Sequence, residues 1–157
     1  MKLGVLVEDG EETRVAIVPN SVPKLMKLGF EVLVESGAGV PAHHLDAEYE
    51  AKGASIVSRD DAMACQMLIC IGAPDFSVLS EGQMVACVSD PFRHPERVKQ
   101  AMEAKVTLMS MDMIPRRLSR AQAMDVNSSQ DNLAGYKAVL MGAAQVPKGI
   151  PMMTTSA

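Results

Sequence analysis

At 157 residues with 48% hydrophobic side chains, the chain can bury one core, which with 3% aromatic residues and 13 methionines has to be largely aliphatic. The net charge of -4, with 15 basic and 19 acidic residues mixed along the chain, disfavours nucleic acid and anionic lipid as partners. No apolar run approaches the roughly 20 residues that span a bilayer, and the first residues turn acidic too early for a secretory signal. We therefore expect a cytoplasmic protein without direct membrane insertion.

Short apolar runs rich in branched residues alternate with stretches of helix formers. The runs predict strands at Leu3–Val7, Val32–Val34, Ile56–Val57, Met67–Ile71, Met84–Val88 and Val106–Met109. The intervening stretches predict helices at Ser21–Leu28, Asp46–Lys52, Asp60–Cys65, Val78–Glu81 and Pro95–Ala104. Strands that are apolar on both faces and alternate with helices indicate a doubly wound α/β fold, with a mainly parallel sheet and helices on both faces.

The segment after the last predicted strand breaks this alternation. Four apolar residues recur there at helical spacing: Leu133, Tyr136, Leu140 and Ala143. They predict a helix of about 16 residues, with Ser128 or Ser129 as its N-terminal cap. A stretch marked by proline and glycine, residues 146–157, follows it and reads as the beginning of another segment. We therefore expect a loop, a connecting helix and a continuation beyond Ala157.

A glycine-rich turn, Gly37–Ala42, matches the GxGxxA form of the dinucleotide-binding fingerprint, with Asp60 about 20 residues further on. Pro41, however, removes a backbone N–H where a bound pyrophosphate would need donors. The pattern therefore favours a tight structural turn over a nucleotide site.

An arginine, Arg14, stands where a polar loop enters an apolar segment. It could bind a carboxylate or a phosphate through two hydrogen bonds. A structural pairing with Glu12, Glu35 or a loop carbonyl explains the same residue without a ligand, and this interpretation is favoured.

The loop Pro115–Ser129 concentrates polar side chains just before the predicted C-terminal helix. These are Arg116, Arg117, Arg120, Gln122, Asp125 and Ser128. Such groups can hydrogen-bond the carboxamide and ribose of a nucleotide. A solvated charged loop has the same composition, so the residue types alone leave both interpretations open.

The cysteines and histidines offer no metal site. Cys65, Cys70 and Cys87 form no CxxC pair and are expected to be buried, reduced thiols. His43 and His44 are adjacent, so their side chains diverge on any regular element. We predict no bound metal.

The run Ser110–Val139, SMDMIPRRLSRAQAMDVNSSQDNLAGYKAV, closely resembles the hallmark loop and helix of proton-translocating NAD(P) transhydrogenase alpha subunits. ETRVAIVP, PKLMKLGFEVLVESGAG and IGAP support the resemblance, which covers essentially the whole chain. Alanine dehydrogenase shares this N-terminal fold. The resemblance implies an N-terminal α/β domain over residues 1–127, then a connecting helix and the start of a Rossmann domain over residues 128–157. NAD(H) would lie in the cleft between the two domains.

The resemblance also implies roles for individual residues. Arg117, Gln122, Asp125 and Ser128 correspond to the loop residues that contact the nicotinamide and its ribose, with Gln122 and Asp125 as the catalytic pair. This loop has one residue more than the family pattern between Pro115 and the Ser119–Gln122 run. Arg116 is therefore an alternative to Arg117.

Alanine dehydrogenases use a lysine and a histidine near the positions of Gly72 and Val88–Asp90, and this chain has neither residue there. The transhydrogenase reaction needs no acid or base, because hydride passes directly between two nicotinamides. The resemblance then implies a beta subunit that binds NADP(H), membrane segments that move protons, a homodimer, a place at the inner membrane periphery, and an isolated chain that is inactive. An alanine dehydrogenase fragment and a non-catalytic interaction module are the alternatives.

Overall fold

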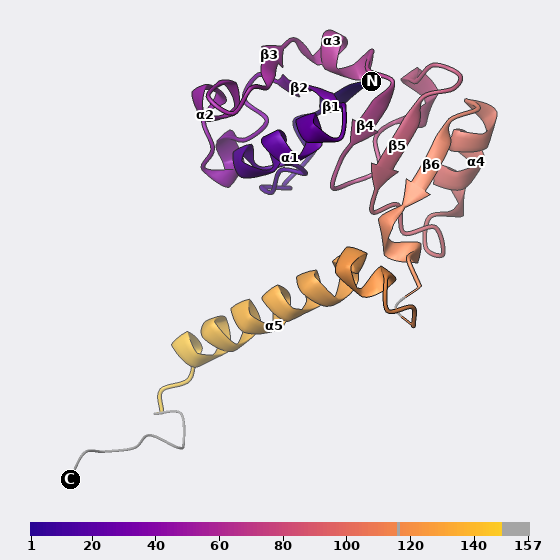
Figure 1. The fold of residues 1–157 in the computed structure, drawn as a ribbon. Helices are drawn as coiled ribbons and strands as arrows, with labels where there is room; N and C mark the ends of the chain where they lie inside the picture. Colours follow the sequence, from indigo (N-terminus) through magenta and orange to yellow (C-terminus); the bar gives the residue numbers. More distant parts are fainter. Residues whose placement is uncertain (116, 149–157) are drawn as a thin grey trace. The chain divides into compact units, whose positions relative to one another are not determined.

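The computed structural model describes residues 1–115 and 117–148, and the chain divides into two compact units between Met113 and Ile114 (Figure 1). The first unit holds the sheet, and the second holds a long helix with the loop before it. The alternative arginine, Arg116, and the end of the predicted continuation, residues 149–157, lie outside the described residues. The domain boundary after residue 127 stays a prediction.

The first unit is built on six parallel strands in the order β3-β2-β1-β4-β5-β6. The strands are β1 Lys2–Val5, β2 Glu31–Glu35, β3 Ser55–Val57, β4 Met67–Ile69, β5 Met84–Cys87 and β6 Thr107–Ser110. Every neighbouring pair is parallel, with Gly4 opposite Leu33 on one side and Leu68 on the other. The strand order reverses beside β1, the place where doubly wound folds open a crevice at the carboxyl ends of the strands.

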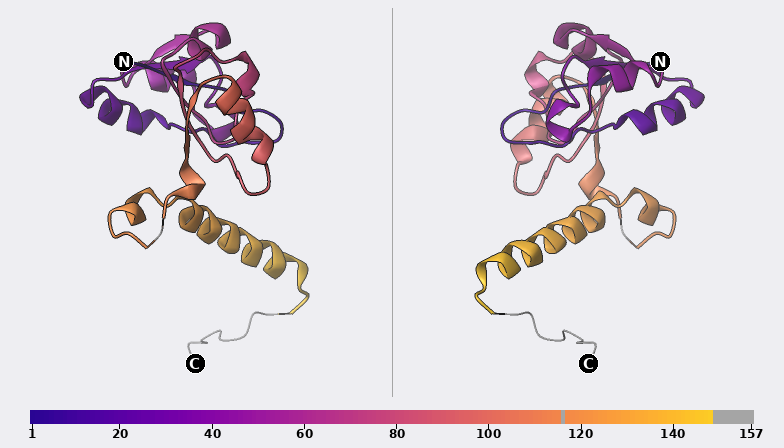
Figure 2. Two further views of the ribbon diagram at one scale, coloured as in Figure 1. Left: turned by 90° about the vertical axis from the view of Figure 1, so that its right-hand side faces the viewer. Right: turned by 90° about the vertical axis from the view of Figure 1, so that its left-hand side faces the viewer.

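Helices cover both faces of this sheet, seen from two further sides in Figure 2. They are α1 Val22–Lys27, α2 Asp46–Glu50, α3 Arg59–Met63 and α4 Pro95–Glu103. α1 and α2 contribute Val22 and Tyr49 to one buried cluster, whereas α3 and α4 contribute Ala62 and Ala101 to the other. The predicted doubly wound α/β class is therefore confirmed, and each face has an aliphatic core of its own.

Glycine at position 4 allows α3 to approach β1 closely. A methyl group added there would collide with the backbone carbonyl of Ala62 and would lie 2.9 Å from Cδ2 of Leu68. Because a backbone atom cannot move aside as a side-chain end can, this position accepts no larger residue without a shift of α3.

One predicted helix, Val78–Glu81, is wrong. The chain instead makes a short 3₁₀ turn at Phe76–Val78, and Leu79 is already extended. The Asp75 carboxylate accepts hydrogen bonds from the backbone N–H and the hydroxyl of Ser77, which starts this turn early. Gly82, with a φ of 87°, then turns the chain into β5.

The second unit contains a 3₁₀ turn at Ala121–Met124 and the helix α5, Val126–Gln145. At 20 residues α5 is longer than predicted, because it begins ahead of the serines expected to cap it. Asp125 is the actual N-cap: its carboxylate accepts the backbone N–H of Ser128 at 3.0 Å. Aspartate caps as well as serine does, so the first available cap starts the helix. Within the described part of the chain, no helix combines the length and apolar character needed to cross a membrane.

Candidate functional site

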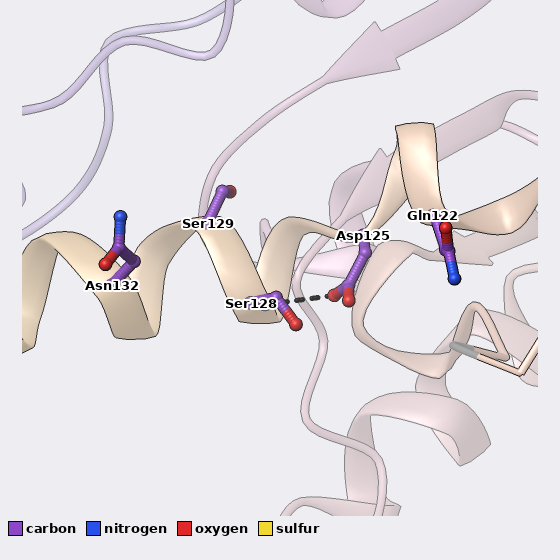
Figure 3. A pocket seen from close by; sticks show the side chains of 5 residues that line it. All are labelled: Gln122, Asp125, Ser128, Ser129 and Asn132. Carbon is purple, nitrogen blue, oxygen red and sulfur yellow. Dashed lines mark hydrogen bonds between the residues drawn. The ribbon is translucent and has the colours of Figure 1, made fainter.

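The start of α5 forms an open hollow of about 600 Å³ (Figure 3). Five side chains line it: Gln122, Asp125, Ser128, Ser129 and Asn132. Gln122 comes from the 3₁₀ turn, Asp125 caps the helix, and the other three belong to the first two turns of α5. The site is thus assembled from one continuous segment of the second unit.

The backbone of this segment fixes where the side chains point. The N–H groups of Ala121 and Gln122 donate to the carbonyl of Leu118, which closes the turn ahead of the helix. Asp125 then ends the turn and caps α5 with the same residue. Because one residue does both, Gln122 and the first turn of the helix are held on either side of Asp125.

The chemistry of the lining is that of a hydrogen-bonding surface. Two side-chain amides both donate and accept, two hydroxyls do the same, and one carboxylate accepts. The Ser129 hydroxyl donates to the Val126 carbonyl at 3.0 Å, so its proton is used within the helix. This set suits a neutral ligand with amide and hydroxyl groups, and its members include no histidine, lysine or cysteine that could transfer a proton near neutral pH.

Three of the four predicted cofactor-binding residues, Gln122, Asp125 and Ser128, line the hollow together. Arg117 is exposed in the turn that precedes the 3₁₀ segment, outside this lining. The sequence patterns did not indicate Ser129 and Asn132 as site residues. Asn132 could have been found from its spacing, since it follows Ser128 by four residues and so lies on the same side of a helix.

The glycine-rich turn at Gly37–Ala42 is structural, as predicted. The Gly37 N–H donates to the Asp46 carboxylate at 2.9 Å, so a carboxylate of the chain already occupies this donor. A Cβ at Gly39 would lie 2.6 Å from the Tyr49 ring, so the second glycine makes room for a buried tyrosine. The turn therefore serves packing and the start of α2.

Arg14 makes the structural pair with Glu12. Its Nε and Nη2 atoms donate to the two carboxylate oxygens of Glu12 at 2.8 and 2.6 Å. The hydrogen bond from the Arg14 side chain is the main reason that the pKa of Glu12 falls to about 2. The favoured interpretation is confirmed, and the guanidinium that could bind a carboxylate already binds one.

Glu8 occupies the crevice where the strand order reverses. Its carboxylate accepts the backbone N–H groups of Ile71 and Gly72, at 2.6 and 3.0 Å, just after β4. Burial raises the pKa of this carboxyl group despite the two hydrogen bonds. The donors at the edge of the sheet that an anionic ligand could use are therefore already taken by the chain itself.

Asp112 plays a similar part after β5 and β6. Its carboxylate accepts the N–H groups of Ser89 and Asp90 at 3.2 and 3.0 Å, and the Ser110 hydroxyl donates to it. Asp90 has a φ of 45°, which is uncommon outside glycine and is held here by these contacts. The loop after β5 is thereby fixed in place.

The three cysteines are buried and free, as predicted. Burial raises the pKa of all three thiols, that of Cys87 to about 12. A protonated, buried thiol is a poor nucleophile and a poor metal ligand. Over residues 1–115 and 117–148, no three histidine, cysteine, aspartate or glutamate side chains gather as a metal site.

A family model described as the N-terminal domain of alanine dehydrogenase/PNT matches residues 4–134. In Rhodospirillum rubrum, the first polypeptide of the NAD(P) transhydrogenase alpha subunit is 40% identical over 156 residues, which cover 93% of this chain and 40% of that protein. The corresponding protein of Rickettsia prowazekii is 35% identical, and the match covers all of this chain and 43% of that one.

Solved structures give the same picture. The transhydrogenase from Sinorhizobium meliloti matches with a TM-score of 0.91 at 37% identity, over 99% of this chain and 48% of that one. An L-alanine dehydrogenase matches with a TM-score of 0.71 at 26% identity, over 77% of this chain and 34% of that one. The chain thus spans less than half the length of the relatives it matches.

Proposed function

Because this chain belongs to the alanine dehydrogenase/PNT N-terminal domain family, we propose that it is the N-terminal part of the alpha subunit of a proton-translocating NAD(P) transhydrogenase. In this role it supplies the nicotinamide side of the NAD(H) site. The hollow at the start of α5 is the observation that carries the proposal, since Gln122, Asp125 and Ser128 lie together there.

The lining of the hollow fits the nicotinamide and ribose of NAD(H). A carboxamide and two ribose hydroxyls need partners that donate and accept, and the amide of Gln122 and the hydroxyl of Ser128 do both. The pyrophosphate needs N–H donors or cations, which a Rossmann domain supplies at a helix N-terminus. The hollow therefore takes one end of the dinucleotide and leaves the other end to the second domain.

When bound, NAD(H) supplies the hydride, and the residues of this chain orient the ring and exclude water from it. Gln122 and Asp125 act through position, because a reaction between two nicotinamides gains rate from alignment and needs no proton transfer. Arg117 or Arg116 completes the contacts of the loop. The carboxyl edge of the sheet takes no part, since Glu8 and Glu12 already occupy its donors.

This geometry favours the transhydrogenase over the alanine dehydrogenase. Gly72 and Ser89 stand at the edge of the sheet where a dehydrogenase would need an amine and an imidazole. Gly72 has no side chain, and Ser89 is buried with its N–H bound to Asp112. Imine chemistry thus has no agent in this unit.

The partners follow from the apolar side chains of α5. Leu133, Tyr136 and Leu140 are 59%, 67% and 50% exposed, and we assign them to the contact with the Rossmann domain. A beta subunit then supplies NADP(H), and its membrane segments couple the transfer to proton movement. In this assembly the subunit is a homodimer, cytoplasmic and peripheral to the inner membrane, and the isolated chain transfers no hydride.

The test joins this chain to a Rossmann domain and adds the NADP(H)-binding partner. Hydride transfer from NADH to an NADP⁺ analogue is measured with the full assembly and with an assembly whose residues 117–132 are replaced by a glycine–serine linker of equal length. We expect transfer only with the native segment. Equal transfer by the two assemblies would contradict the proposal.

A further inference from the structure

The polar lining of the hollow extends one turn further along α5 than the family's contact residues. Gln122, Asp125, Ser128 and Asn132 follow one another at spacings of three, three and four residues. In a helical segment such spacings place side chains along one side. In Figure 3 Asn132 lies beyond Ser128, at the end of the row opposite to Gln122.

The surface beside Asn132 is open. Gly135, the next residue along this side of the helix, has no side chain, and a Cβ added there would meet nothing within 4 Å. A flat group can therefore reach the Asn132 amide without a clash from its own helix. Ser129 offers less, because its hydroxyl proton is already donated to Val126.

We propose that Asn132 binds the carboxamide of the nicotinamide and makes the site select nicotinamide over nicotinate. This inference rests on the proposed function, because it takes the hollow to be the nicotinamide side of the NAD(H) site. A side-chain amide pairs with another amide through two hydrogen bonds, one donated and one accepted. A nicotinate carboxylate only accepts, so the carbonyl oxygen of Asn132 would face a second acceptor.

The expected preference is modest but measurable. One neutral hydrogen bond that is lost or mismatched corresponds to about a 10-fold change in affinity. Asn132 lies on a helix and is exposed, so replacement by alanine raises helix propensity and leaves the fold intact. A change in selectivity in this variant is therefore not a folding effect.

The experiment uses the full chain, labelled with ¹⁵N, and two probes at millimolar concentration: nicotinamide mononucleotide and nicotinate mononucleotide. Binding is followed through the backbone amides of Gln122, Asp125 and Ser128. The side-chain NH₂ of Asn132 reports on the contact itself. Gln145→Ala is the matched control, since Gln145 is an exposed amide residue at the far end of the same helix.

We expect nicotinamide mononucleotide to shift the Asn132 side-chain signal and to bind about 10-fold more tightly than nicotinate mononucleotide. Asn132→Ala should abolish this preference, and Gln145→Ala should retain it. Equal affinity for the two probes, or a preference that survives in Asn132→Ala, overturns this inference and leaves the proposed function standing. If neither probe shifts any residue of the hollow, the proposed function fails together with it.

Discussion

The two units of the chain differ in where their apolar side chains lie. In residues 1–113 the aliphatic side chains form two buried clusters, one on each face of the sheet. In the described part of the second unit Ala121 is the buried hydrophobic residue, whereas Leu133, Tyr136, Val139 and Leu140 are each at least half exposed. The first unit thus has a core that can stabilise it alone, and the second has the candidate site and an apolar helix surface.

The polar side chains differ in the same sense. In the first unit Glu8, Asp46 and Asp112 each accept backbone N–H groups at the end of a strand or in a turn. In the second unit Gln122, Ser128 and Asn132 line an open hollow. The edge of the sheet, where many α/β proteins bind ligands, is thus satisfied internally, and the hydrogen-bonding groups available to a ligand lie at the start of α5.

The largest expected effect on stability comes from Leu68, which is fully buried in the cluster beneath α3 and α4. Leu68→Ala should lower the free energy of unfolding by about 3 kcal/mol, because it removes buried methyl groups and leaves a cavity. Leu140→Ala, on exposed α5, should change it by no more than about 0.5 kcal/mol. Urea denaturation of both variants measures the difference, and equal losses would show that α5 packs into the same core.

The capping of α5 separates the structural role of Asp125 from its chemical one. Asp125→Ala removes the acceptor for the Ser128 N–H and should cost about 1 kcal/mol of helix stability. Asp125→Asn keeps a good cap, so its helix content should match that of the unchanged chain. In the assembled enzyme Asp125→Asn should still slow hydride transfer.

Circular dichroism of the chain and stopped-flow transfer in the assembly measure these two effects separately. If Asp125→Asn transfers hydride at the normal rate, then Asp125 is only a helix cap. The contrast with Asp125→Ala controls for loss of the helix start.

The smallest effect is expected from the Glu12–Arg14 pair in the first unit. The pKa of Glu12, about 2, lies below its ordinary value of 4.5, so the pair stabilises the folded chain above about pH 4.5 and loses this contribution as the pH falls towards 2. Because the pair is partly exposed, Glu12→Gln should cost under about 1 kcal/mol near neutral pH, and less in high salt.

Thermal melts of Glu12→Gln at pH 6 and pH 3, with Glu11→Gln as the control, measure this contribution. The deficit of Glu12→Gln should shrink at the lower pH. A deficit that grows as the pH falls would contradict the assignment of the pair.

Sequence patterns predicted the sheet well because each strand is a short apolar run, and both faces of a parallel sheet are buried. They failed at Val78–Glu81, where Asp75 and Gly82 impose a turn on residues of ordinary helix propensity. The start of α5 was misplaced because aspartate and serine are equally good caps, so composition could not choose between them.

The site was predicted less completely than the fold. Gln122, Asp125 and Ser128 were found through family resemblance, whereas the residue types alone also fitted a solvated loop. Asn132 was missed because it lies inside the predicted helix, where the helical spacing singles out the apolar residues. The pairing of Arg14 was predicted only as one of several, since any of its acidic neighbours could have served.

Alignment of the nicotinamide by the loop before α5 is tested most directly by Gln122→Asn. The shorter side chain keeps the amide but moves it, so in the assembly of this chain, its Rossmann domain and the NADP(H)-binding partner we expect hydride transfer to slow by about 100-fold. Equilibrium NADH binding by the same variant should change little. Normal transfer together with lost NADH binding would contradict this role, because it would make Gln122 a simple affinity contact.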